Sequence, residues 1–182
     1  MAVADMQRLE DLLRSAETAD APVERWNPPY CGDIGLAIQR DGSWHYRGSV
    51  IPRAALVKLF ARVLRRDPDD RYYLVTPAEK VDVAVADAPF VAVEMEAVGE
   101  GRAQSLIWRT NVDDLVRTGP AHPLRFVVEG PDGGLKPYVH VRGRLEALVG
   151  RSLVYDLVDL SSEGPDGTPG LWSDGAFFPL PG

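Results

Sequence analysis

Cysteine is almost absent from this 182-residue sequence, which contains Cys31 alone and only three histidines. A single thiol excludes an intramolecular disulfide and a cysteine-based zinc site. Long apolar runs are missing too, since no stretch approaches the roughly 18 residues of a membrane-spanning helix. We therefore expect a cytoplasmic protein of a reducing compartment, with no membrane span, no cofactor and no bound metal.

Positive charge is also scarce, because 20 Lys and Arg residues stand against 27 Asp and Glu residues, giving a net charge of −7. Proteins that bind nucleic acids need a basic surface that displaces counterions from the phosphates, so we do not expect a nucleic-acid partner. The remaining composition, 45% hydrophobic and 26% charged, is that of a folded globular protein. The length suits one ordinary domain or two small units.

Alternating apolar residues and turn signals predict that most of the first two thirds forms strands. We expect them at 34–39, 44–46, 72–75, 81–85, 91–96 and 105–110. Asp41-Gly42 and Gly99-Glu100-Gly101 have the composition of tight hairpin turns. The pairing of these strands should therefore be mainly antiparallel.

Helical signals occur at three places in the same region. Apolar residues at helical spacing predict an amphipathic docking helix over Met1 to Ala16 and a longer helix from Pro52 to Arg66. A short turn of helix is expected over 111–117, where Asn111 resembles a helix start. Prolines make 19–29 an extended lead-in to the first strand.

The second half repeats the order of the first. We predict a strand at 124–128, a turn at Asp132-Gly133-Gly134, a return strand at 138–142 and a helix over 145–157. After the helix we expect a polar loop at 162–170 and an aromatic strand at 171–180. The two Asp-Gly turns lie 91 residues apart, as do Arg53 and Arg144. We infer an α+β protein with a duplicated strand–strand–helix–strand unit, mainly antiparallel sheets and an N-terminal accessory helix. Its parts are 1–30 (helix and lead-in), 31–118 (first unit with an extra hairpin) and 119–182 (second unit).

Several segments together resemble a bacterial family. They are Trp26-Asn27-Pro28-Pro29-Tyr30-Cys31-Gly32-Asp33-Ile34, Asp41-Gly42-Ser43-Trp44-His45-Tyr46, Tyr73-Leu74-Val75-Thr76-Pro77-Ala78-Glu79-Lys80-Val81, Ala88-Pro89-Phe90, Pro137-Tyr138-Val139-His140-Val141-Arg142 and Trp172-Ser173-Asp174-Gly175. The sequence is similar here to domain of unknown function family 1285. The resemblance implies an α+β protein of two repeated structural units. It implies a part in signal transduction and supplies no catalytic set.

Each candidate motif also has a simpler structural explanation. Glu79-Lys80 presents either a charge pair to a ligand or a solvated hairpin corner. Trp44 and Tyr46 share one strand face and line a pocket or, as we favour, pack against the adjacent helix. Tyr138, His140 and Arg142 form a row that binds an anion or, as we favour, belongs to a hydrated sheet surface.

Catalytic and metal-binding interpretations have weaker support. Nucleophilic catalysis by Cys31 would require a nearby histidine, so we expect this residue to be a buried small hydrophobe. A metal site would require His45, His122 and His140 to converge without any short ligand spacing. Asp113-Asp114 is expected to interact with a helix N-terminus rather than to act as an acid and base pair.

The leading hypothesis is a non-enzymatic module that binds a small anionic ligand or a partner protein. We predict an anion-preferring site bordered by Trp44, Tyr46, Arg53, Lys80, Arg142 and Arg144, with Arg53 and Arg144 at matching helix starts. The alternative is a hydrolase-like enzyme of small-molecule chemistry, in which Asp33, His45 or His140 carries the proton. The convergence of a base with a nucleophile would distinguish the two.

Overall fold

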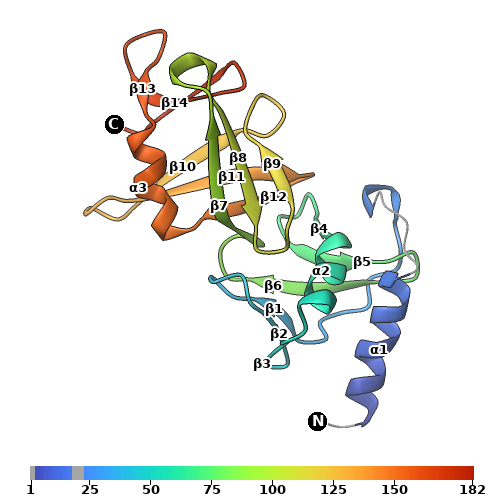
Figure 1. The fold of residues 1–182 in the computed structure, drawn as a ribbon. Coiled ribbons are helices and arrows are strands. Elements are labelled where there is room, and N and C mark those ends of the chain that lie inside the picture. Colours follow the sequence, from blue (N-terminus) through green and yellow to red (C-terminus); the bar gives the residue numbers. More distant parts are fainter. Residues whose placement is uncertain (1–2, 18–22) are drawn as a thin grey trace. The chain divides into compact units, whose positions relative to one another are not determined.

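The computed structural model describes residues 3–17 and 23–182 and divides the chain into two compact units, Met1–Asp87 and Ala88–Gly182 (Figure 1). Residues 1–2 of the predicted first helix and 19–22 of the predicted lead-in lie outside the described residues. In the described part of the chain, no helix combines the length and apolarity needed to cross a membrane.

The first unit is built on a six-stranded sheet in the order β3-β2-β1-β6-β5-β4. Its strands are β1 (Leu36–Ile38), β2 (Trp44–Tyr46), β3 (Ser49–Val50), β4 (Leu64–Arg66), β5 (Tyr72–Val75) and β6 (Lys80–Val85). Neighbouring strands are antiparallel except for the central pair, β1 and β6. The helical elements are α1 (Val3–Glu17), the 3-10 turn η1 (Val23–Arg25) and α2 (Ala54–Arg62), which joins β3 to β4.

Period-two burial explains the core of this unit. Leu36, Ile38, Trp44 and Tyr46 alternate with less buried residues and point toward the interior. The amphipathic helix α2 contributes Phe60, whose ring centroid lies 6.0 Å from that of Trp44. Helix α1 contacts α2 and buries its own small apolar face, so it belongs to the first unit as a docked accessory helix.

The second unit contains another six-stranded sheet, in the order β10-β11-β12-β7-β8-β9. Its strands are β7 (Phe90–Val98), β8 (Ser105–Thr110), β9 (Leu115–Arg117), β10 (Leu124–Glu129), β11 (Gly134–Arg142) and β12 (Leu145–Val149). The two edge strands, β9 and β10, are joined by residues 118–123 alone. Within this connection Gly119 and His122 form an antiparallel bridge, which brings the end of β9 close to the start of β10 and so curls the sheet, although the two strands do not pair with each other.

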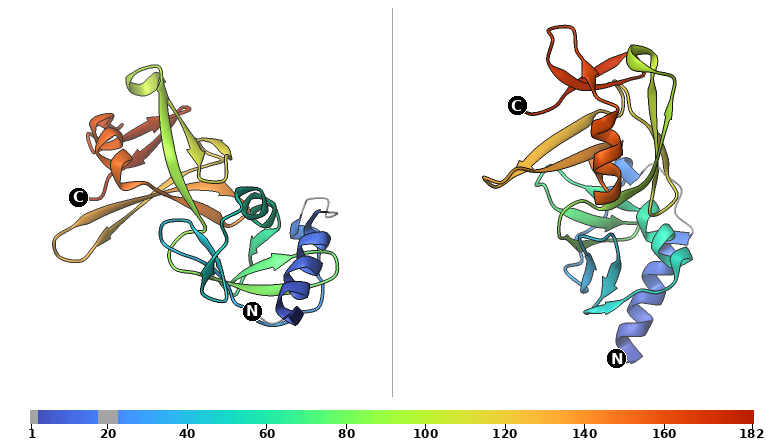
Figure 2. Two further views of the ribbon diagram at one scale, coloured as in Figure 1. Left: turned by 60° about the horizontal axis from the view of Figure 1, so that its bottom comes forward. Right: turned by 60° about the vertical axis from the view of Figure 1, so that its left-hand side comes forward.

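A small sheet and a helix pack on the curled sheet. The elements are η2 (Gly101–Ala103), α3 (Arg151–Asp159), β13 (Ser162–Glu163), β14 (Pro169–Ser173) and β15 (Ala176–Pro179). Helix α3 contacts β7 and β11, while β14 contacts β8. The amide of Gln104 donates to the Trp172 carbonyl at 2.9 Å. Within this unit, the β10–β11 hairpin extends away from the other elements in both views of Figure 2.

The predicted α+β class, the mainly antiparallel pairing and the duplication are confirmed. In each six-stranded sheet the first and last strands lie side by side in the centre and are parallel, and the other strands follow outward in order. Strands β1 to β6 therefore correspond to β7 to β12. The repeat does not follow the 91-residue spacing, because Asp41-Gly42 joins β1 to β2 whereas Asp132-Gly133 joins β10 to β11.

Three predicted elements are corrected. The helix expected over 52–66 ends at Arg62, because 64–66 pairs with β5. The helix expected over 145–157 divides into β12 and α3, because Leu145 to Val149 alternates in burial and pairs with β7 and β11. The expected turn of helix at 111–117 is absent, because Asp113 adopts a φ of 66° and a strand follows.

Two further expectations change at the level of the units. The predicted division after residue 118 falls inside the second sheet, between its two edge strands, and the compact units divide at 87/88 instead. The closing strand expected over 171–180 is the β14–β15 hairpin, because Asp174 and Gly175 both have positive φ angles and reverse the chain.

Candidate functional site

The six residues of the predicted anion site are distributed over both units. The first unit holds Trp44, Tyr46, Arg53 and Lys80, and the second holds Arg142 and Arg144. The side chains of Trp44 and Tyr46 are 1% and 3% exposed. These two aromatic residues therefore belong to the core, which is the packing role that we favoured.

The expected match between Arg53 and Arg144 is not found. Arg53 precedes α2 as its N-cap residue and makes no side-chain capping bond. Arg144 lies in the turn between β11 and β12, well before α3 begins at Arg151. Arg144 does not lie at a helix start because the segment after it, predicted to be helical, forms a strand over 145–149. Anion binding by these two exposed arginines stays a prediction.

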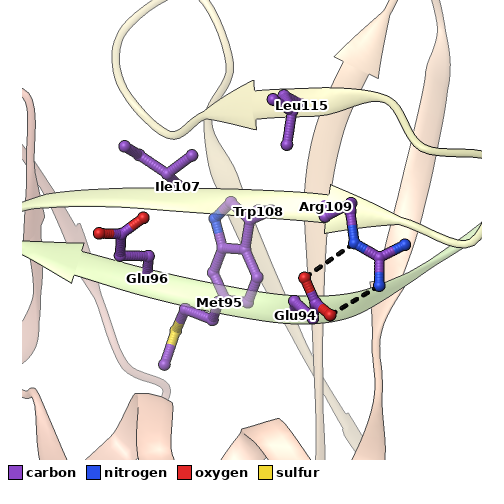
Figure 3. Close-up of a pocket in the computed structure, with 7 residues that line it drawn as sticks. All are labelled: Glu94, Met95, Glu96, Ile107, Trp108, Arg109 and Leu115. Atoms are coloured by element: carbon purple, nitrogen blue, oxygen red, sulfur yellow. Dashed lines mark hydrogen bonds and ion pairs between the residues drawn. The ribbon is translucent and has the colours of Figure 1, made fainter.

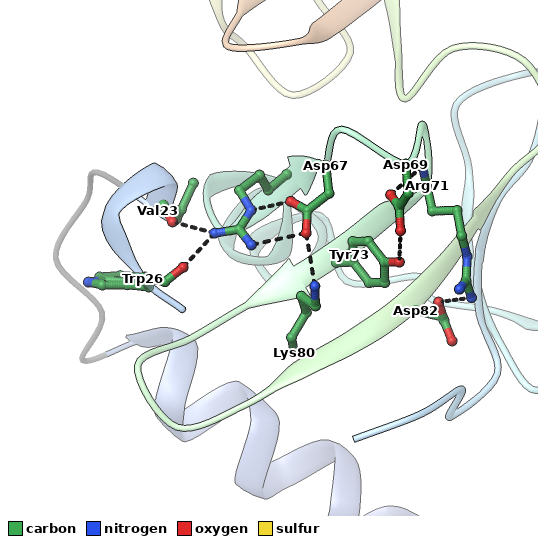
Figure 4. A network of polar contacts seen from close by, with 9 residues as sticks. Val23, Trp26, Asp67, Asp69, Arg71, Tyr73, Lys80 and Asp82 are labelled. Carbon is green, nitrogen blue, oxygen red and sulfur yellow. Dashed lines mark hydrogen bonds and ion pairs between the residues drawn. The ribbon is translucent and has the colours of Figure 1, made fainter. Parts of the chain in front are cut away.

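Lys80 belongs to a polar network around Asp67, in the turn after β4 (Figure 4). The Arg65 guanidinium donates two hydrogen bonds to the Asp67 carboxylate, at 2.5 and 3.1 Å, and Lys80 Nζ donates a third at 2.9 Å. Arg65 also donates to the backbone carbonyls of Val23 and Trp26, at 2.9 and 2.7 Å. The Asp67 carboxylate thus binds two cations, Arg65 of β4 and Lys80 of β6, and Arg65 links them to the segment before β1.

The electrostatics of this network favour a structural role. Burial acts to raise the pKa of Asp67, but the hydrogen bonds and charges of Arg65 and Lys80 outweigh it and lower that pKa. The ammonium of Lys80 also lies 4.3 Å from the centroid of the Tyr73 ring. Lys80 is therefore already engaged by a carboxylate and an aromatic face.

Tyr73 extends the same network to a second carboxylate. Its hydroxyl donates to Asp69 at 2.6 Å. Burial and this hydrogen bond raise the pKa of Tyr73 to about 12 and the bond lowers the pKa of Asp69. Because the folded state holds the phenolic proton more tightly than the ordinary value near 10, the resulting stability is present below pH 10 and is lost as the pH rises toward 12.

Replacing Tyr73 by phenylalanine should remove this alkaline dependence. We expect Tyr73→Phe to be less stable than the wild type at pH 8 and to lose less stability between pH 10 and 12. Urea unfolding across that range measures the difference. Tyr155→Phe, which alters an exposed tyrosine, is the control and should keep the wild-type profile. Equal alkaline slopes for the wild type and Tyr73→Phe would contradict the assignment.

The proton carriers of the enzyme alternative are engaged in local contacts. Asp33 accepts the Gly35 amide proton at 2.7 Å. His45 Nε2 lies 3.1 Å from the Ser43 hydroxyl, which donates to Asp41 at 2.6 Å. In a hydrolase triad the serine donates to the histidine instead. Cys31, which was expected to be buried, is exposed, and its Sγ lies 3.5 Å from the Pro29 carbonyl.

Sequence reasoning missed a pair of histidines in the second unit. His122 and His140 lie with their Nδ1 atoms 3.2 Å apart. Eighteen residues separate them, and no ligand-like spacing marks them in the sequence. They meet because the turn at Gly119 to His122 leads directly into β10, which pairs with β11.

The second unit has a shallow depression of about 250 Å³ on the face of β7, β8 and β9 (Figure 3). It is lined by Glu94, Met95, Glu96, Ile107, Trp108, Arg109 and Leu115. Arg109 donates to both Glu94 oxygens, at 2.8 and 2.7 Å, and to Asp113 at 2.8 Å. These contacts raise the pKa of Arg109 and lower that of Glu94. Beside this ion pair, Ile107 and Leu115 form an apolar surface.

The depression adjoins an open sheet edge. Strand β9 is the last strand of the sheet. Two backbone hydrogen bonds join β8 to the residues that flank β9: the Thr110 amide of β8 donates one, and the Thr118 amide donates the other, each at 2.9 Å. Since backbone groups alternate in direction along an antiparallel strand, those of Leu115 and Arg117 face away from β8. The Leu115 side chain is itself 73% exposed.

Comparisons with known proteins agree with the two-unit organisation. Residues 21–88 match a family model described as "Domain of unknown function (DUF1285), N-terminal domain". Residues 89–180 match "Protein of unknown function (DUF1285), C-terminal domain". A search of curated proteins gave no match.

Two solved structures are similar to this chain. A DUF1285 family protein from Silicibacter pomeroyi DSS-3 shares 50% identity, covers 93% of both chains and gives a TM-score of 0.85. A DUF1285 family protein from Shewanella baltica OS155 shares 32% identity over 69% of this chain and 91% of its own, with a TM-score of 0.53.

Proposed function

Since this chain belongs to the DUF1285 family, whose description gives no activity, we propose its function from its own surface: it is a non-enzymatic module that binds a partner protein. The observation that carries the proposal is the apolar strip of the exposed Leu115 and the half-buried Ile107 beside the open edge of β9 (Figure 3). A part in signal transduction, which the family resemblance implies, and a cytoplasmic location suit such a module.

The distribution of exposed apolar side chains supports a protein partner. Among the described residues, the large exposed ones are Tyr30 and Val50 in the first unit and Val93, Val98, Leu115, Val128, Tyr155 and Val158 in the second. Protein interfaces combine an apolar centre with a polar rim. The strip has that composition, because the Glu94 and Arg109 ion pair and Glu96 border it.

The shape of the surface also favours a protein over a small molecule. Small-molecule sites are concave and bury most of their ligand, whereas this depression is shallow and lies on a sheet face. An extended segment placed along β9 could bond to the backbone groups of Leu115 and Arg117 while its side chains cover the apolar strip.

A charge on the strip should abolish partner binding. We expect Leu115→Glu to lose the protein that wild-type bait captures from cells of the source organism, because a carboxylate would be buried in the apolar centre of the interface. Once that protein is identified, its affinity should fall at least about tenfold, because burying an unpaired carboxylate costs more than the roughly 1.4 kcal/mol that a tenfold change represents.

The control is Val50→Glu, which places the same charge on an exposed apolar residue of the first unit. It should bind like the wild type. Capture of the same protein by Leu115→Glu, or its loss in both variants, would contradict the proposal.

A further inference from the structure

The His122 and His140 pair is held in place at the connection of residues 118–123 between β9 and β10. Backbone hydrogen bonds between Gly119 and His122, both 3.1 Å, fix the turn that carries His122. The His140 amide donates to the Pro123 carbonyl at 3.1 Å, which fixes β11 beside that turn. Both side chains are partly exposed, so solvent reaches the pair.

Hydrogen bonds determine which ring nitrogens carry protons. His140 Nε2 lies 2.7 Å from the Gly143 carbonyl, which can only accept, so this nitrogen carries the proton. In the neutral ring, His140 Nδ1 is then an unprotonated base that points at His122. His122 Nδ1 lies 3.2 Å from both His140 Nδ1 and the His140 carbonyl, so it donates its proton between them.

This arrangement matches two requirements for metal ligation. Ligating histidines usually donate their other ring nitrogen to a carbonyl or carboxylate, as His140 does to Gly143. Two nitrogens bound to one tetrahedral ion at about 2.0 to 2.1 Å each lie roughly 3.3 Å apart. The observed Nδ1 separation of 3.2 Å, with ring centroids 5.2 Å apart, fits two imidazoles that share one ion.

We propose that His122 and His140 together bind one divalent transition-metal ion of the kind that prefers imidazole, such as Zn²⁺ or Ni²⁺. Nearby cations are compensated, because Arg142 pairs with Asp114 at 2.8 Å and Arg125 pairs with Glu146 at 2.7 Å. Within the described ranges, no third His, Cys, Asp or Glu joins the pair. The remaining ligand positions are therefore open to water or to an oxygen of a bound partner.

The binding test uses the untagged full chain titrated with Zn²⁺ in a calorimeter. The third histidine, His45, lies in the first unit and supplies the matched control. We expect wild-type protein and His45→Ala to bind one equivalent with the same affinity. Affinity should fall at least tenfold in His122→Ala and His140→Ala. Mg²⁺ and Ca²⁺, which prefer oxygen ligands, should not bind.

A second measurement on the wild type does not depend on the folding of any variant. Zn²⁺ should shift the Nδ1 resonances of His122 and His140 in long-range ¹H–¹⁵N spectra and leave those of His45 unchanged. Binding that is equal in all three variants, or Zn²⁺-induced shifts at His45 alone, would overturn the proposal. The absence of any Zn²⁺ binding by the wild type would overturn it as well, leaving the pair a structural hydrogen bond between the 119–122 turn and β11.

Discussion

Asp67→Ala is expected to lower the free energy of unfolding of the first unit by about 3 kcal/mol, because it leaves two partly buried cations without their shared carboxylate. The Asp67 side chain is only 12% exposed and receives three hydrogen bonds from Arg65 and Lys80. Removing one partner of a buried ion pair costs about 3 to 5 kcal/mol. We take the lower end because solvent reaches the edge of this cluster.

The effect of this substitution should depend on pH in a defined direction. The folded pKa of Asp67 is lowered below its ordinary value. Its contribution is therefore present above the unfolded pKa of about 3.9 and is lost as the pH falls through the lower folded value. The stability difference between the wild type and Asp67→Ala should thus be full at pH 7 and shrink in acid.

Urea unfolding followed by circular dichroism at pH 7 and at pH 3 tests both statements. Asp70→Asn is the control, because it removes a carboxylate that is 64% exposed and 3.4 Å from Arg66 and keeps a side chain that tolerates the φ of 64° at this position. Exposed pairs of this kind contribute about 0 to 1 kcal/mol. Equal losses for the two variants would show that the Asp67 network does not stabilise the fold.

Strand alternation made the first unit largely predictable, whereas the second contained an ambiguous segment. The β1–β2 hairpin follows from alternation on both sides of Asp41-Gly42, and the structure contains this hairpin. In β12, Leu145, Leu148 and Val149 fit helical spacing, while Leu145, Ala147 and Val149 fit a strand. Pairing with β7 and β11 resolves the ambiguity, and that tertiary contact leaves no mark in the local sequence.

The repeat was detectable only as a coarse order of elements. Strands β3 and β4 contain two and three residues, too few to show a period of their own. The Asp-Gly turns were the strongest periodic signal, and they belong to non-equivalent hairpins. Correspondence between the sheets depends on a central parallel pair formed by strands far apart in sequence.

Candidate sites were less predictable than strands because their partners meet through tertiary pairing. Lys80 was recognised as a charge after a fixed loop, but its engagement by Asp67 depends on the pairing of β4, β5 and β6. The depression beside β9 was missed because its strand was expected to be a turn of helix. A helix at 111–117 would have had no free edge, so no docking surface followed from the sequence.

A buried hydroxyl joins the two sheets of the second unit. Ser173 Oγ in β14 donates to the Thr118 carbonyl at 2.7 Å and accepts the Leu106 amide proton at 2.8 Å. The Thr118 hydroxyl in turn lies 2.8 Å from Trp108 Nε1, which donates to it. Ser173 and Thr118 are fully buried, so water cannot replace these bonds.

Ser173→Ala is therefore expected to lower the free energy of unfolding of the second unit by about 2 to 4 kcal/mol. The substitution removes little apolar contact but leaves the Leu106 amide and the Thr118 carbonyl buried without a partner. Each such orphan costs about 1 to 3 kcal/mol, and partial relaxation lowers the sum. Chemical denaturation measures the loss.

Amide hydrogen exchange then separates this mechanism from general destabilisation. In Ser173→Ala the Leu106 amide should exchange much faster than its neighbours in β8, because it alone loses its acceptor. Ser152→Ala, at an exposed position of α3, should change neither stability nor exchange at Leu106. If Ser173→Ala accelerates all β8 amides equally, the hydroxyl acts through packing alone, and the sheets are joined by their apolar contacts.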